Sequence, residues 1–512
     1  MSLKDSAVSP ATPEKKGLLS PVLLYTAGSI WMAMAGVLLI PLAVSLAQPA
    51  GTVEGHFSQS LSFGAVIAMA FISGAGAVYF SRDKAFTTRI AASDGAIIAA
   101  ICWITVGFMA SLPYYFSGWI QGFENCFFEG ISGITTTGAS VVADPSIMPS
   151  GILLWRSMTQ WLGGMGIIVL FVAVLPAIGE SSHSLFHSEI PGGANFKKAT
   201  PRIRSTARAL WIIYLVLTVA ETLMLWAAGL TFFDALLHAF TTIATGGFST
   251  FSDSNVSFNV TIHWIVIIFM AIAGMNFTLH FRMARGEGLK TYFGSSEFKV
   301  YMGLLTLTGT LLTLDLLLTS DMPGTTYSYA ITHGFFQSTS ILTTTGYMSA
   351  DFGSWSQFAQ SILFMLMFVG GCSGSTSGGF KVIRHVLIFK AVEGELKRMA
   401  NPRRVTAIRL DGEVINESLY TNALAFLALF MAVFGVSGIA LTMMGMDMVS
   451  AFSASVACLG NVGPGLGTVG PATTYMGVPA VGKYILCAEM LLGRLELFGL
   501  VLFIMMMARG NK

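Results

Sequence analysis

Long apolar stretches alternate with short amphiphilic ones along most of this chain. A helix needs about 20 predominantly apolar residues to cross a bilayer. The pattern therefore predicts about ten transmembrane helices, two leading ones and then four pairs of an outer and an inner helix. The predicted spans are 21–47 and 60–80, then 94–112 with 149–178, 207–229 with 260–281, 299–319 with 356–392, and 419–444 with 478–508.

Between the two members of each pair lies a short amphiphilic run that cannot cross the membrane. These runs, at 121–133, 231–243, 327–341 and 447–459, are predicted to be re-entrant pore helices. Each leads into a polar loop that carries a glycine, and glycine permits backbone conformations that a Cβ would oppose. The loops read GITTTGAS, TIATGGFS, ILTTTGYM and CLGNVGPG, with their common glycines at Gly138, Gly247, Gly346 and Gly463.

These glycines lie about a hundred residues apart, which indicates a diverged repeat of outer helix, pore helix with loop, and inner helix. A second marker is a glycine about one span beyond each loop, at Gly164, Gly274, Gly371 and Gly493. The expected organisation is a tail at 1–17, two leading helices at 18–92, and repeats at 93–206, 207–298, 299–418 and 419–512.

Composition agrees with an all-α polytopic membrane protein. Of 512 residues, 54% are hydrophobic and only 11% are charged, and the mean hydropathy is +0.70, whereas soluble domains carry about 25% charged residues. Paired carboxylates and the HExxH, GxSxG and Walker motifs are missing, so we expect no enzyme. The five scattered cysteines indicate apolar packing. We expect membrane lipid as a partner and no nucleic acid.

Basic residues give the expected orientation. By the predicted spans, 25 of the 28 Lys and Arg residues fall on one side of the membrane, and an excess of positive charge marks the cytoplasmic side. Both termini are therefore expected in the cytoplasm, with all four glycine loops facing outward. The three exceptions are Arg156, Lys483 and Arg494. Arg156 and Lys483 are near outer helix ends and are expected to extend their charges toward the interface.

The outward loops carry acids and no bases. An acidic, base-free mouth would raise the local cation concentration, and the negative C-terminal ends of the pore helices would point at the pore centre. The alternative is that these are ordinary solvated carboxylates. The acids are Glu54, Glu124, Glu129, Asp144, Asp234, Asp253, Asp321, Asp351 and Asp447.

The third inner helix is interrupted by the run GGCSGSTSGGF, from Gly370 to Phe380. Each glycine disfavours helix by about 1 kcal/mol relative to alanine, and irregular backbone at membrane depth is tolerated where it lines a cavity or is buried in protein. We predict a gating loop across the pore below the glycine loops; a helix-packing surface of small residues is the alternative. Its candidate residues are Gly370, Gly371, Ser373, Gly374, Ser375, Thr376, Ser377, Gly378 and Gly379.

Arg494 is the second candidate for the gate. It lies in the middle of the fourth predicted inner helix, where an arginine costs about 2.5–3.5 kcal/mol on insertion scales. We predict that it faces the pore, meets the gating loop and repels cations. The alternative is a structural arginine that donates to carbonyls. Glu496 is only two residues away and so points elsewhere on the helix.

The loops TTTGA, ATGGF, TTTGY and NVGPG, the segments QWLGGMGIIVL and MLLGRLELF, and the run GGCSGSTSGGFK resemble the membrane subunit of bacterial Trk potassium-uptake systems. That subunit belongs to the Trk/Ktr/HKT superfamily, and the resemblance covers nearly the whole chain. The two leading helices favour the Trk branch over the Ktr branch.

The resemblance implies one chain folded around a pseudo-fourfold pore in a bacterial inner membrane, with potassium as the transported ion. It also implies a homodimer and a cytosolic ring of nucleotide-binding regulatory domains docked on the inner face. Backbone carbonyls in the four loops would replace the ion's hydration shell. The implied filter residues are Thr136, Thr137, Gly138 and Ala139; Thr245, Gly246, Gly247 and Phe248; Thr344, Thr345, Gly346 and Tyr347; and Asn461, Val462, Gly463 and Pro464.

A glycine in all four loops is similar to potassium-selective members of the superfamily. Only the third loop has the Gly-Tyr of potassium channels, and the fourth departs most, so sodium discrimination is expected to be weaker than in a symmetric channel. The expected function is potassium uptake through a gated, channel-like pore. The alternative is a symporter coupled to sodium or protons, which buried mid-span carboxylates would favour. Asp315 is the only such acid expected in an outer helix, with Asp94 and Glu489 in or near other spans.

Overall fold

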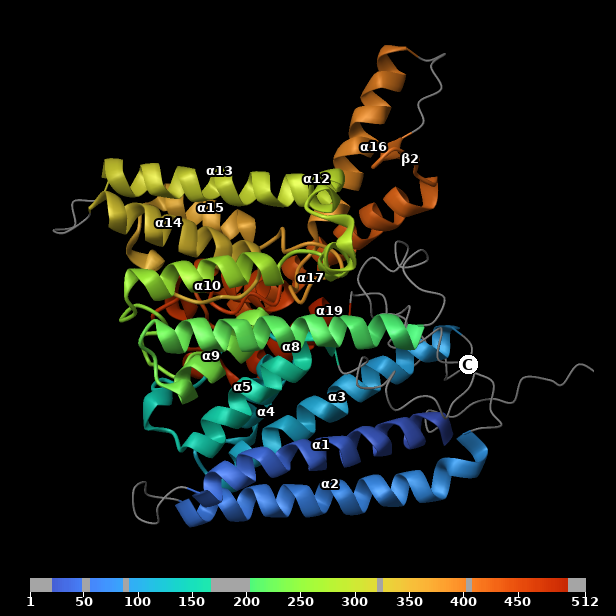
Figure 1. Cartoon of the computed structure of the whole chain (residues 1–512), viewed down its shortest axis with the longest axis vertical. Coiled ribbons are helices and arrows are strands. Elements are labelled where there is room, and N and C mark those ends of the chain that lie inside the picture. The colour runs from blue at the N-terminus through green and yellow to red at the C-terminus, as the bar shows by residue number, and fades with distance from the viewer. Residues whose placement is uncertain are drawn as a thin grey trace, which may run out of the picture.

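The computed structural model describes residues 21–47, 56–85, 92–166, 203–319, 326–401 and 408–495. The described chain is mostly helical (Figure 1). Its one sheet there is an antiparallel pair of very short strands, β1 (Arg409–Leu410) and β2 (Glu413–Val414). The all-α class is therefore confirmed. The expected N-terminal tail lies outside the described residues.

The two leading helices, α1 (Pro21–Ala47) and α2 (His56–Ala85), run side by side at one edge of the molecule (Figure 1). They cross closely at two glycines. A Cβ on Gly28 would lie 2.7 Å from the Gly74 oxygen, and a Cβ on Gly74 would lie 2.7 Å from the Gly28 oxygen. Small residues of this kind let two membrane helices approach each other closely.

Four long helices supply the outer member of each repeat: α3 (Ala92–Ser117), α8 (Ile203–Ala227), α13 (Ser296–Thr319) and α17 (Glu417–Met443). Together with α1 and α2 they are the six described helices that are long and apolar enough to cross a membrane as single helices. Large apolar side chains such as Ile212, Leu215 and Val216 of α8 are exposed. Such a surface suits lipid rather than water.

The four pore helices form where the amphiphilic runs predict them: α4 (Phe123–Ile134), α9 (Phe232–Ile243), α14 (Tyr327–Leu342) and α18 (Met448–Leu459). Three begin with a side-chain cap that accepts a hydrogen bond from an amide of the first turn, as capping residues do. The caps are Thr231, Thr326 and Asp447.

The inner helices are shorter than predicted. They are α5 (Ser150–Gly164), α10 (Val260–Ala273), α15 (Gln357–Leu366) and α19 (Ala480–Arg494), each of 10 to 15 residues. The expectation of a continuous helix over 260–281 is wrong, because the chain bends by 92° between α10 and the segment Phe277–Glu287. Gly274 ends the helix there, since glycine stabilises helices poorly. Residues 167–178 and 496–508, where α5 and α19 were expected to continue, lie outside the described residues.

Short elements connect these helices. The bend after α10 leads into α11 (Phe277–Arg282), a helical turn η5 (Met283–Glu287) and α12 (Lys290–Gly294). The third inner helix resumes after the glycine-rich run as α16 (Val382–Ala400), which projects beyond the bundle in Figure 1. Four single turns lie after the pore loops: η1 (Pro145–Ile147), η6 (Phe352–Ser354), η7 (Gly467–Val469) and η8 (Tyr475–Gly477).

The largest hydrophobic core joins the two ends of the chain. It contains α1 and α2, the first repeat, and residues of α18 and α19 in the fourth repeat, such as Leu459 and Leu486. The first and fourth repeats therefore pack together. All five cysteines are buried and unbridged, which confirms their predicted role in packing.

Candidate ion pathway and gate

The four glycine loops share one backbone conformation. Two residues before each common glycine, a residue other than glycine has a positive φ of 51° to 57°, and the glycine itself has a φ of 76° to 102°. A positive φ is uncommon outside glycine and costs free energy. Its repetition at the same place in four loops supports a common origin. The four strained residues are Thr136, Thr245, Thr344 and Asn461.

The hydrogen bonds that end the pore helices repeat as well. In each loop the residue before the common glycine donates its amide hydrogen to the carbonyl five residues earlier, over 2.7–2.9 Å. Carbonyls at the helix end that lack a partner within the helix are satisfied in this way. The pairs are Thr137 to Ser132, Gly246 to Thr241, Thr345 to Ser340, and Val462 to Ala457.

The common glycines link the four loops into a closed ring. A Cβ built on Gly138 would overlap the carbonyl oxygen of Gly246 in the second loop. The same overlap occurs from the second loop to the third and from the third to the fourth, and a Cβ on Gly463 would lie 2.7 Å from the Thr137 oxygen of the first loop. The loops therefore follow one another in chain order around a common centre, and their contacts leave no space for a side chain.

One face of the first inner helix supports the second loop. Gln160 donates through Nε2 to the Gly246 carbonyl over 2.7 Å and accepts from the Phe248 amide over 3.0 Å. One turn away, Arg156 Nη1 donates to the Ser249 carbonyl over 2.8 Å. The Gly246 carbonyl therefore has a side-chain donor, unlike its counterparts at Thr137, Thr345 and Val462, for which the described residues supply none. This difference makes the ring asymmetric.

Arg156 and Glu129 form a buried ion pair. Arg156 Nε lies 2.7 Å from Glu129 Oε1, with side-chain exposures of 4% and 0%. The Ser140 hydroxyl and the Val141 amide also donate to Glu129, and the Arg156 guanidinium lies 3.6 Å from the centre of the Phe248 ring. The expectation that Arg156 extends to the interface is wrong. Glu129 fits neither the acidic mouth nor the alternative of a solvated carboxylate, because the two charges neutralise each other inside the protein.

Lys483 is also buried, and its ammonium donates over 2.8 Å to the carbonyl of Met476, which precedes the start of its helix. Of the acids expected to face outward, Asp144, Asp351 and Asp447 each cap a helical turn. Hydrogen bonds from the Ser450 hydroxyl and amide lower the pKa of Asp447 below its ordinary value. Glu54 and Asp321 lie outside the described residues.

The run from Gly370 to Gly379 is irregular, as predicted. Gly370, Gly374 and Gly379 have φ values of 77°, 68° and 77°. The run packs against the inner ends of the pore loops. The Thr245 hydroxyl donates to the Thr376 hydroxyl over 3.3 Å, and the Gly378 amide donates to the Thr344 hydroxyl over 2.7 Å.

Gly378 also lies directly against Asn461. The run from Gly370 to Gly379, predicted to be a gating loop, thus contacts three of the four residues with a strained positive φ. Arg494 contacts the fourth, because its Nη1 donates to the Thr136 hydroxyl over 3.1 Å.

The contacts of Arg494 agree with both interpretations of the sequence, a structural arginine that donates to carbonyls and a residue that meets the predicted gating loop. Its Nη1 donates to the Thr376 carbonyl of the gating loop over 2.8 Å, and its Nη2 donates to the Gly164 carbonyl over 3.0 Å. It is therefore bonded to carbonyls and also meets the loop. Its guanidinium joins the first inner helix, the gating loop and the first pore loop at one point.

Comparison with known proteins identifies the family. The family model described as TrkH, cation transport protein, matches residues 62–511. The chain belongs to the TrkH family. It is 40% identical over 431 residues, 83% of this chain and 88% of the relative, to the Trk system potassium uptake protein TrkH of Salmonella typhimurium. The Escherichia coli TrkH is 38% identical over 480 residues, 93% of this chain and 96% of that protein.

A solved structure agrees. The crystal structure of the potassium transporter TrkH from Vibrio parahaemolyticus matches with a TM-score of 0.82 and 35% identity, covering 94% of this chain and 98% of that one. The predicted Trk/Ktr/HKT membership is therefore confirmed. The TrkH family is a family of transporters, so the expectation that this is no enzyme is also confirmed. With its apolar helices, this TrkH-family chain is a multi-pass membrane protein.

The glycines beyond the loops fall into two kinds in this TrkH-family chain. Gly164 and Gly274 each lie against the residue that ends the next pore helix, Ala244 or Thr343. Gly493 instead lies against the carbonyl of Leu459 in its own repeat, as Gly163 does against Ile134. Gly371 packs within the gating loop against Ser377. These four glycines therefore do not occupy equivalent positions, and their spacing in the sequence aligned the repeats only approximately.

Two carboxylates of the apolar helices are buried, and one of them, Glu221, was not expected inside an outer helix. Glu221 of α8 is fully buried, and among the described residues neither of its oxygens receives a hydrogen bond. Glu489 of α19 is 1% exposed and accepts from the Ser455 hydroxyl over 2.6 Å. Asp315 is thus not the only acid inside an outer helix. The charged letter in the apolar run LTVAETLML was the available signal for Glu221.

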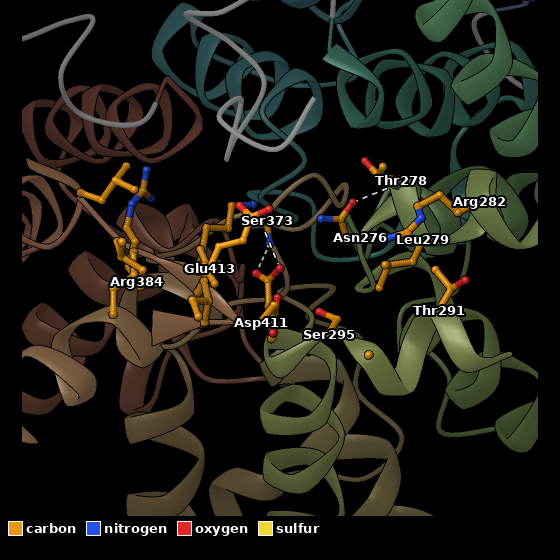
Figure 2. A pocket seen from close by; sticks show the side chains of 18 of the residues that line it. Asn276, Thr278, Leu279, Arg282, Thr291, Ser295, Ser373, Arg384, Asp411 and Glu413 are labelled. Atoms are coloured by element: carbon orange, nitrogen blue, oxygen red, sulfur yellow. Dashed lines mark hydrogen bonds between the residues drawn. The ribbon is translucent and has the colours of Figure 1, made fainter. Parts of the chain in front are cut away.

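A cavity of about 1310 Å³ borders the predicted gating loop at Ser373 and also borders Lys381, just beyond the loop. Its other walls come from the bend after α10, the start of α13, the strand pair and α16. Figure 2 shows Ser373, Asn276 and Asp411 around this space. The cavity therefore adjoins the part of the gating loop that does not contact the pore loops.

Proposed function

We propose that this protein takes up potassium through a gated, channel-like pore with the four glycine loops as its selectivity filter. The closed ring of contacts between the common glycines supports this most directly. Four loops with the same backbone conformation place the same groups around one centre. Potassium filters work by such a ring, because carbonyl oxygens replace the hydration shell of the ion. Relatives that carry the name potassium uptake protein support the choice of ion.

We further propose that the loop from Gly370 to Gly379 and Arg494 form the closed gate. The contacts of the loop with Thr245, Thr344 and Asn461, and of Arg494 with Thr136, support an obstruction at the centre of the ring. A guanidinium at that point adds an electrostatic barrier, since it repels cations. Opening then requires the loop and the guanidinium to leave the axis.

The partners remain proposals too. We propose a homodimer in the bacterial inner membrane, with both termini in the cytoplasm and a nucleotide-binding Trk-type regulatory ring on the inner face. Relatives named as parts of a Trk system support a multi-subunit assembly. The exposed, charged helix α16, with ion pairs such as Lys397 to Glu393, extends from the bundle and offers a surface for it (Figure 1).

A symporter coupled to sodium or protons is the second candidate. The buried carboxylates Glu221 and Glu489 favour it, because ionisable groups inside membrane proteins often serve coupling. Against it, Glu221 interacts with Thr242 of the second pore helix, and among the hydrogen bonds of the described residues neither Glu221 nor Glu489 bonds the run from Gly370 to Gly379. The channel-like proposal therefore takes precedence.

Reconstitution into vesicles separates the two. We expect potassium flux to follow the potassium gradient at a fixed membrane potential, with a smaller sodium flux and no effect of an imposed proton or sodium gradient. Uptake of potassium against its own electrochemical gradient, driven by protons or sodium, would establish the symporter instead.

A further inference from the structure

We propose that Glu297 is a positioning residue that holds the gating loop closed. It lies at the start of α13, is 5% exposed, and uses both carboxylate oxygens on one residue of the loop. Its Oε1 accepts from the Ser373 amide over 2.6 Å, and its Oε2 accepts from the Ser373 hydroxyl over 3.1 Å. Hydrogen bonds to a charged acceptor are stronger than neutral ones. The loop is thus fastened at its Ser373 end to an outer helix of the same repeat.

The gating loop has further ties near Ser373. The Val382 amide donates to the Gly371 carbonyl over 3.0 Å, and the Lys381 ammonium donates to the Ser377 carbonyl. The Phe277 amide donates to the Gly374 carbonyl and the Cys372 amide donates to the Gly274 carbonyl, each over 2.9 Å. Both are backbone bonds between neutral groups. Among the described residues, Glu297 is the one acidic side chain that accepts hydrogen bonds from the loop. Removing the Glu297 carboxylate therefore weakens the attachment of the loop at Ser373 and leaves the contacts between the loop and the pore loops in place.

The neighbouring cavity gives the released loop somewhere to go. Both Glu297 and Ser373 line the cavity of about 1310 Å³, and Figure 2 shows Ser373 beside it. A loop in a close-packed interior cannot move without displacing its neighbours, whereas a loop beside open space can. Because glycines at Gly370, Gly374 and Gly379 already adopt a positive φ, this segment can change its backbone at low cost.

The test measures rubidium uptake into vesicles by the full-length protein and by variants, corrected for folded protein. This proposal rests on the proposed gate, so the loop-shortened variant and Arg494→Ala are included. Glu297→Ala should raise uptake about tenfold, since two hydrogen bonds to a charged acceptor are lost. Glu297→Gln keeps one acceptor and should give an intermediate rise, and it also serves if the alanine variant folds poorly.

Glu287 provides the matched control. It lines the same cavity, is 45% exposed and pairs with Arg282, but it does not bond the gating loop. Glu287→Ala should leave uptake unchanged. Hydrogen–deuterium exchange over residues 370–381 gives a second reading: it should rise in both Glu297 variants and not in the control. The potassium-to-sodium flux ratio should stay at the parent value.

Three results would overturn the proposal. If the loop-shortened and Arg494→Ala variants raise uptake but neither Glu297 variant does, the gate stands and the role of Glu297 is wrong. If none of the variants raises uptake, the gate and the role of Glu297 both fail. An equal rise in the Glu287→Ala control would assign the effect to the charge of the cavity in general.

Discussion

At the scale of single residues, strained backbone marks the proposed ion pathway. Thr136, Thr245, Thr344 and Asn461 all adopt a positive φ that side chains rarely adopt. Such strain persists only where surrounding contacts over-determine it. Here those contacts come from the repeated hydrogen bonds at the pore-helix ends, and three of the four residues meet the gating loop. The glycines are visible in the sequence, whereas the strained threonines are not, because threonine gives no signal of a positive φ.

The first prediction concerns Gly138→Ser. A Cβ at this position would overlap the Gly246 carbonyl, and φ is already 84°. Backbone strain of this kind costs about 1–3 kcal/mol. We therefore expect the preference for potassium over sodium to fall by roughly tenfold, since about 1.4 kcal/mol corresponds to that factor. Flux of both ions into vesicles measures it.

Gly36→Ser is the control for this change. Gly36 is an exposed glycine of α1, and a Cβ there would meet no atom within 4 Å. Its flux ratio should equal that of the parent. An unchanged ratio in a correctly folded Gly138→Ser protein would remove Gly138 from the filter.

At the scale of helices, each inner helix ends just below the ring of loops. The helices end at Gly164, Ala273, Leu366 and Arg494. Glycines stand at or soon after three of these ends, at Gly164, Gly274 and Gly370, and glycine permits the backbone to leave the helix there. The length of the apolar runs predicted continuous spans, because hydropathy reports burial in lipid and not whether a helix continues.

The second prediction concerns the ion pair between α4 and α5. Breaking a buried pair leaves one charge unpaired and costs about 3–5 kcal/mol. Glu129→Gln or Arg156→Met should each lower the free energy of unfolding by about that amount, and the double variant should lose less than the sum of the two, because the residues are in contact. Denaturant or thermal unfolding of the purified protein in detergent measures it.

The exposed pair of Arg282 and Glu287 is the control, with the same 2.7 Å separation but exposures of 48% and 45%. Exposed pairs contribute about 0–1 kcal/mol, so Glu287→Gln should change stability little. Equal losses at the two pairs would contradict the argument from burial.

The third prediction concerns the gate. Shortening the loop from Gly370 to Gly379 should raise potassium flux, and so should Arg494→Ala, because each removes part of one obstruction. Loss of charged hydrogen bonds such as that from Arg494 to the Thr376 carbonyl suggests a rise of roughly tenfold for the arginine. The double variant should give less than the product of the single effects, since the residues touch.

Flux into vesicles, corrected for the amount of folded protein, measures these effects, and the potassium-to-sodium ratio should persist in all three variants. If both single variants conduct no more than the parent while remaining folded, the run is a packing surface and the gate proposal fails.

At the scale of the whole molecule, the first and fourth repeats share one core with the leading helices. Four consecutive repeats can surround one centre only if the first and the fourth repeat touch. The close approach of Gly463 to the Thr137 carbonyl is that contact. The family assignment and the similarity to a solved TrkH structure agree with this architecture. By the sequence, 25 of the 28 Lys and Arg residues are expected on the cytoplasmic side.

The fourth prediction concerns that basic side. Arg403 and Arg404 lie outside the described residues, in the basic segment 381–409. Reversing both charges should weaken binding of a Trk-type nucleotide-binding subunit by about tenfold or more, because like charges at an interface are strongly unfavourable. Co-purification and binding titrations at two salt concentrations measure it.

Reversal of Lys15 and Lys16, also expected in the cytoplasm, is the matched control and should leave binding intact. If binding also survives reversal at Arg403 and Arg404, these residues act through topology and anionic lipid alone.

The sequence by itself determined the local elements. The outer helices, the four pore helices, the glycine loops and the irregular run at 370–379 all follow from apolar runs and glycine placement, because hydropathy and backbone freedom act over short stretches. The family could be named from the same motifs. These local features do not depend on how the repeats pack against one another.

Only the tertiary structure decided which distant residues meet. The pairing of Glu129 with Arg156, the support of the Gly246 carbonyl by Gln160, the burial of Glu221 and the bonds from Ser373 to Glu297 join separate elements. Each depends on how the pore helices and inner helices assemble around one centre. The sequence gives the charge of these side chains but not their partners, and in a membrane protein it is the partner that decides whether a buried charge is tolerated.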